Sequence, residues 1–141
     1  MIKTLQISNS LQPADVVIAK KRNGIGRILN HYIVYLGNNT FIGNLEKGVQ
    51  ILTNYEIQKL LKEYEPTKIK PFSGSNYERK LAIKRAYSKI GQKYNLLNFN
   101  CEHFANLVQY GTKSSKQVTI ALFVAFGIAY KLIKTATNGK R

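Results

Sequence analysis

The strongest local signal in this chain is a β-hairpin pattern at residues 31–42. Residues 31–36 (HYIVYL) are rich in the aromatic and β-branched residues that favour strands. Gly37, Asn38 and Asn39 supply a tight turn, and residues 40–42 (TFI) form the return strand. A hairpin pairs its strands antiparallel, so the fold has to be built around an antiparallel sheet.

The rest of the chain predicts further strands and several capped helices. Strands are predicted at 16–19, 48–52 and 68–70. Helices are predicted after the capping-box pairs Thr53/Glu56 and Ser75/Glu78, and over residues 101–110. In the second of these helices, Ile83, Ala86, Tyr87 and Ile90 are predicted to lie on one face, and the helix is predicted to end at Gly91. This order of elements predicts an α+β fold.

Composition limits the chemistry available to the chain. Its 141 residues suit one domain, and a single cysteine excludes a disulfide framework and a cysteine-rich zinc site. Two histidines and seven carboxylates offer little for a metal centre, so we expect neither metal nor cofactor. The net charge of +15 favours an anionic membrane surface, nucleic acid or an acidic protein as partner. The first ten residues lack a secretory pattern, which predicts a cytoplasmic location.

Cys101 is the clearest candidate for chemistry. If Asn100 caps the helix, Cys101 is its first residue, where free backbone N–H groups stabilise a thiolate and an acyl oxyanion. His103 stands two residues further on and does not share a helix face with Cys101, so it is a poor base for the thiol. We expect it to have a structural role or to support the site indirectly. His31 is the other histidine, and only the fold can bring it near. A lone cysteine at a helix start is also consistent with a small core residue.

Three stretches carry a family resemblance: residues 11–15 (LQPAD), 30–37 (NHYIVYLG) and 100–104 (NCEHF). In this order they resemble the H-box and NC motifs of the lecithin:retinol acyltransferase (LRAT) family, which includes the H-Ras-like suppressor phospholipases and acyltransferases. Residues 110–111 and 115–118 are also similar to the family. The resemblance implies a circularly permuted papain-like fold of the NlpC type, with residues 1–117 as the catalytic domain.

The same resemblance implies acyl transfer through a thioester. Cys101 corresponds to the family's nucleophile, and His31 to the base that takes the thiol proton. The family usually has a second histidine twelve residues after the first, where this chain has Gly43. The neighbouring Asn44 is predicted to orient His31 instead, which requires a bulge or a shifted turn because adjacent strand residues face opposite sides.

The apolar segment at residues 118–133 (VTIALFVAFGIAYKLI) completes the chain's organisation. As a helix of sixteen residues it would span about 24 Å, short of the ~30 Å hydrocarbon core. Lys131, Lys134, Lys140 and Arg141 follow the pattern of basic residues at a membrane interface. We expect residues 118–141 to be a membrane-associated helix and basic tail, as in several relatives. A core helix packed on the domain is the alternative.

The leading interpretation is a thiol-dependent acyl hydrolase or acyltransferase acting on phospholipid esters at an anionic membrane surface. Two alternatives stay open: a cysteine peptidase or amidase of the same superfamily, and a membrane-binding module with a degenerate site. Nucleic-acid binding would rest on charge alone, without a recognisable module, and is not expected.

Overall fold

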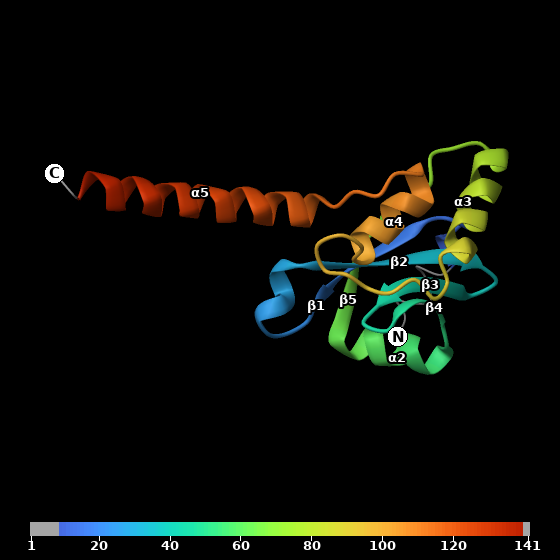
Figure 1. The fold of residues 1–141 in the computed structure, drawn as a ribbon. Coiled ribbons are helices and arrows are strands. Elements are labelled where there is room, and N and C mark those ends of the chain that lie inside the picture. The colour runs from blue at the N-terminus through green and yellow to red at the C-terminus, as the bar shows by residue number, and fades with distance from the viewer. Residues whose placement is uncertain (1–8, 140–141) are drawn as a thin grey trace.

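The computed structural model describes residues 9–139, which form a sheet, four helices and a short 3-10 helix (Figure 1). The strands are β1 (Val16–Lys21), β2 (Asn30–Gly37), β3 (Thr40–Leu45), β4 (Gly48–Leu52) and β5 (Tyr64–Lys70). The helices are η1 (Ile25–Ile28), α2 (Asn54–Glu63), α3 (Asn76–Ser88), α4 (Cys101–Tyr110) and α5 (Lys116–Asn138). The α+β prediction is confirmed, and each predicted strand and helix is present.

All pairings in the five-stranded sheet are antiparallel, in the order β4-β3-β2-β1-β5. The central hairpin of β2 and β3 turns at Asn38 and Asn39, whose φ angles are 50° and 56°. Asparagine tolerates this left-handed conformation better than most residues, which is why the pair suits a two-residue hairpin turn. The predicted hairpin is therefore confirmed.

Side chains of β2 alternate between the two faces of the sheet. Tyr32 and Val34 belong to the core cluster with Phe104 of α4, whereas His31 and Ile33 line a pocket with residues of α2. Figure 1 shows the same division, with α3 and α4 on one side of the sheet and α2 on the other. The main apolar core thus lies between the sheet and α4, and the pocket lies on the opposite face of the sheet.

Helix α3 ends at Ser88, so Ile90 lies just beyond the helix that was predicted to reach Gly91. Ala82 and Ala86 are fully buried, whereas Tyr87 and Ile90 are about half exposed (47% and 48%). Small alanine side chains let α3 approach α4 closely, which leaves no room for the larger residues between the helices. The buried face of α3 is therefore formed by its two alanines.

Helix α5 leaves the domain as a long projecting rod (Figure 1). Its 23 residues make it long and apolar enough to cross a membrane, and none of its most apolar stretch is buried. At 1.5 Å per residue the helix spans roughly 35 Å, more than the ~30 Å hydrocarbon core. The sixteen-residue estimate was too short because the helix extends past the apolar segment at both ends. The alternative of a core helix packed on the domain is wrong.

Candidate active site around Cys101

Cys101 occupies the first position of α4, as the capping pattern predicts. The side chain of Asn100 accepts hydrogen bonds from the backbone N–H groups of Glu102 and His103, each at 3.0 Å. These bonds fix the start of the helix and hold Cys101 against the beginning of β2. The helix ends at Gly111, whose φ of 74° requires the left-handed conformation that glycine adopts freely.

The thiol of Cys101 is surrounded by backbone groups of two elements. Its S–H group donates to the carbonyl oxygen of Asn30 at 3.9 Å. Burial is the main cause that raises the pKa of this thiol, and the negative charge of Glu102 raises it further. Hydrogen bonds from the backbone N–H groups of Tyr32, Glu102 and Cys101 lower this pKa. The resting group is therefore a neutral thiol beside donors that favour a negative charge.

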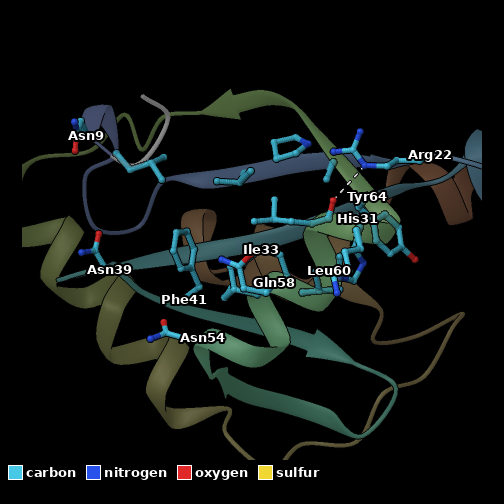
Figure 2. A pocket seen from close by; sticks show the side chains of 17 residues that line it. Asn9, Arg22, His31, Ile33, Asn39, Phe41, Asn54, Gln58, Leu60 and Tyr64 are labelled. Carbon is cyan, nitrogen blue, oxygen red and sulfur yellow. Dashed lines mark hydrogen bonds between the residues drawn. The ribbon is translucent and has the colours of Figure 1, made fainter. Parts of the chain in front are cut away.

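His31 lies at one end of a pocket of about 740 Å³ between the sheet and α2 (Figure 2). Its ring stands 5.1 Å from that of Tyr64, centroid to centroid, and its Nε2 atom is buried with no hydrogen-bond partner. Burial lowers the pKa of His31 to about 4. A neutral imidazole with a free ring nitrogen is able to accept a proton, although burial disfavours the charged product.

The structure brings Cys101 and His31 to the same end of the sheet. The sulfur approaches the carbonyl of Asn30, directly before His31, and lies near the amide of Tyr32, directly after it. A thiolate at Cys101 would also raise the pKa of Tyr64, which stacks on His31. In the described part of the chain, no hydrogen bond joins the two side chains. Cys101 packs in the core with Tyr32, whereas the side chain of His31 leaves β2 on the opposite face.

Asn44 lies apart from His31. In the β2–β3 register Gly43 is paired with Ile33, so Asn44 projects from the face that α4 covers. Its side-chain N–H group donates to the carbonyl of Phe99 at 2.6 Å, and its Oδ1 atom is buried without a partner. The register shift in this hairpin falls between Tyr35 and Gly37, so it does not change which face of the sheet Asn44 occupies. The geometry gives no support to an orienting role for Asn44.

Gly43 occupies the position where the resemblance expects a second histidine. It shares a face with His31, but a Cβ atom there would stand 2.8 Å from the Cδ1 atom of Ile33. A side chain at this position therefore requires Ile33 to move. The chain has filled with Ile33 the space into which a second histidine would project.

His103 has a structural role in the cap of α4. Its Nδ1 atom accepts a hydrogen bond from the backbone N–H group of Asn100 at 3.2 Å, which completes the reciprocal capping box. The structural interpretation of His103 is confirmed.

Two polar residues near the thiol were not predicted as site residues from the sequence. Glu102 is 3% exposed, and its carboxylate accepts hydrogen bonds from Tyr32, Ser115 and Gln117. The side chain of Gln117 pairs with the backbone of Asn30. The family-like stretch at 115–118 marked this region, but only the fold shows that it reaches β2.

Within residues 9–139, no group of three or more histidine, cysteine or acidic side chains could hold a metal ion. The site is thus a single thiol at a helix start, one neutral imidazole, and backbone donors, on an α+β scaffold.

Comparison with known proteins finds one family and one curated relative to which the chain is similar. Residues 47–114 match the model of the family described as "Lecithin retinol acyltransferase". The chain is also 42% identical over 57 residues to human "Phospholipase A and acyltransferase 2". That alignment covers 39% of this chain and 35% of the relative, so it spans about a third of the relative's length. The predicted resemblance to the LRAT family is confirmed; the matched segment contains Cys101 and begins after His31 and Asn44.

Proposed function

We propose that this protein is a thiol-dependent acyl hydrolase or acyltransferase that acts on phospholipid esters through a thioester at Cys101. The observation that carries the proposal is the position of the sulfur, at the start of α4 and next to three backbone N–H groups. The human relative's name supports acyl transfer and phospholipid cleavage as the class of reaction. The order of histidine strand before cysteine helix supports a permuted papain-like fold.

In the first step His31 takes the thiol proton and the sulfur attacks the ester carbonyl. A C–S bond forms, the oxyanion accepts hydrogen bonds from backbone N–H groups, and the C–O bond to the lysolipid breaks. The leaving oxygen takes the proton from His31. In the second step His31 deprotonates water or an acceptor amine or alcohol, which attacks the thioester, releases the acyl group and restores the thiol. The apolar pocket that ends at His31 offers room for an acyl chain.

We further propose that α5 holds the domain at a membrane. Its exposed apolar residues have no protein partner among the described residues, and a lipid bilayer removes such a surface from water. Lysines near the end of the helix, including Lys131 and Lys134, suit an anionic interface. This arrangement would bring lipid esters to the catalytic domain.

The test is intact-mass spectrometry of the full chain after incubation with phosphatidylcholine vesicles containing anionic lipid. We expect an acyl adduct on the wild type that hydroxylamine removes, and none on Cys101→Ala. His31→Ala should slow adduct formation by on the order of 10² to 10⁴, the usual contribution of a positioned base. Adduct formation at the wild-type rate in His31→Ala would remove His31 from the mechanism.

A second candidate, a membrane-binding module with a degenerate site, is favoured by one set of observations. The thiol and the imidazole are both held neutral, no hydrogen bond joins them, and Gly43 replaces the expected second histidine. Vesicle binding without adduct or fatty-acid release would support this candidate. Cleavage of peptide amides without vesicle dependence would instead support a peptidase.

A further inference from the structure

The side chain of Gln117 fixes the backbone unit that stands beside the thiol. The backbone N–H group of Asn30 donates to Oε1 of Gln117 at 2.7 Å, and Nε2 of Gln117 donates to the carbonyl of Asn30 at 3.3 Å. The same carbonyl accepts the S–H group of Cys101. Asn30 and Gln117 are 87 residues apart in the chain, so this paired contact joins the root of α5 to the start of β2.

Glu102 completes the connection from the other side. One carboxylate oxygen accepts the hydroxyl of Ser115 at 2.5 Å and the backbone N–H group of Gln117 at 3.1 Å. The other accepts the hydroxyl of Tyr32 at 3.4 Å. Glu102 thus links β2, α4 and the beginning of α5, directly beside the nucleophile.

The burial of Glu102 needs an explanation beyond stability. Neither ion pair of the described residues includes Glu102, so its buried carboxylate is held by hydrogen bonds alone. A buried carboxylate without a cation is costly, and its negative charge raises the pKa of the neighbouring thiol. An apolar residue would avoid both effects but could not fix three elements at once.

We propose that Glu102 and Gln117 are positioning residues that hold the start of β2 and the root of α5 in register with the thiol of Cys101. This inference rests on the proposed role of Cys101 as nucleophile. Neither side chain needs to touch the substrate. Their function is to keep the Asn30 carbonyl and the Tyr32 amide at the sulfur, so that the geometry of the site depends on how α5 leaves the domain.

The experiment compares Gln117→Ala and Glu102→Gln with the full wild-type chain in two assays. The first measures the rate of acyl-adduct formation on vesicles. The second measures alkylation of the chain's single cysteine by iodoacetamide across pH, read by intact mass. Gln109→Ala is the matched control, because Gln109 is a buried residue of α4 whose side chain also bonds backbone carbonyls, those of Ala14 and Lys70, away from the thiol.

Adduct formation should fall between about 10- and 100-fold in both variants, as expected when a reacting group is displaced by about 1 Å. The alkylation profile should shift to lower pH in Glu102→Gln, because a negative charge that raises the thiol pKa is removed. It should shift to higher pH in Gln117→Ala, because the sulfur loses the fixed Tyr32 N–H group that lowers its pKa. Gln109→Ala should keep the wild-type profile despite a comparable loss of stability. Gln117→Met keeps the side-chain length without its hydrogen bonds and should behave like Gln117→Ala.

Wild-type adduct rates and alkylation profiles in Glu102→Gln and Gln117→Ala would overturn the positioning role. The same changes in Gln109→Ala would also overturn it, because they would report general loosening of the fold. If the wild type forms no adduct but the two variants alone shift the alkylation profile, the positioning role stands and the proposed acyl chemistry fails. The alkylation assay therefore separates the two failures.

Discussion

At the scale of single residues, the most consequential group is the buried imidazole of His31. An unfolded chain protonates histidine near pH 6.5, whereas burial lowers the pKa of His31 to about 4. Between these values the unfolded state binds more protons, so stability falls as the pH drops from 6.5 toward 4. An imidazole with this pKa is neutral at physiological pH.

The first prediction follows from that difference. Lowering the pH from 7.5 to 5 should cost the wild type about 2 kcal/mol through His31, from the pKa difference and 1.36 kcal/mol per unit. His31→Gln should remove this part of the pH dependence. Urea unfolding at the two pH values measures it for both proteins. Equal losses in wild type and variant would show that His31 titrates normally.

Asn44 carries a second residue-scale prediction. Its buried N–H group bonds the carbonyl of Phe99, so Asn44→Ala leaves that carbonyl unpaired and should destabilise the fold by about 1 to 3 kcal/mol. Asn44→Asp should cost more at pH 7, because it buries a charge facing the same carbonyl. Thermal unfolding measures both variants. An Asn44→Asp protein as stable as Asn44→Ala would contradict the assigned contact.

At the scale of elements, local signals predicted most of the fold. The caps at Thr53, Ser75 and Asn100 are all formed, because a capping box depends on residues only three apart. The hairpin followed from its turn residues for the same reason. The buried alanine face of α3 was not predicted, since it depends on the contact with α4, and α5 extends past its apolar segment at both ends.

The candidate site was predictable only in part, for the same physical reason. The position of Cys101 followed from the local cap of α4. The face taken by Asn44 depends on the register of β2 with β3, and the contact of Gln117 with Asn30 joins residues 87 positions apart. Neither relation leaves a periodic signal in the sequence. Gly43 marked a departure from the family pattern, and the structure adds that Ile33 fills the space beside it.

The cap of α4 gives a prediction at this scale. Asn100→Ala should destabilise the protein by about 1 kcal/mol, the usual cost of a lost cap, and should also slow acyl-adduct formation because the thiol follows the helix start. Ser75→Ala removes the corresponding cap from α3 and is the matched control. It should cost similar stability, measured by urea unfolding, and leave the adduct rate unchanged. A comparable loss of rate in both variants would show that the rate follows overall stability and not the cap of α4.

At the scale of the whole molecule, the proposed membrane attachment draws on both α5 and the net charge. The whole chain carries a net charge of +15. Helix α5 adds exposed apolar side chains, which include Phe123 and Phe126. Charge attracts the protein to anionic lipid over about 10 Å at 0.1 M salt, whereas apolar insertion is independent of that screening. The two contributions can therefore be separated by salt.

We predict that Phe123→Glu combined with Phe126→Glu will abolish salt-resistant binding to anionic vesicles. Both side chains are more than 70% exposed and contact no core residue, so the unfolding midpoint of the domain should not change. Tyr55→Glu, an equally exposed change on α2, should leave vesicle binding intact. Flotation at 0.1 M and 1 M salt measures each protein. If the double variant still floats at 1 M salt, Phe123 and Phe126 do not carry the salt-resistant binding, and another apolar surface has to account for it. If the double variant binds only at 0.1 M salt and forms the acyl adduct there at a reduced rate, α5 supplies the lasting attachment that keeps Cys101 at its substrate.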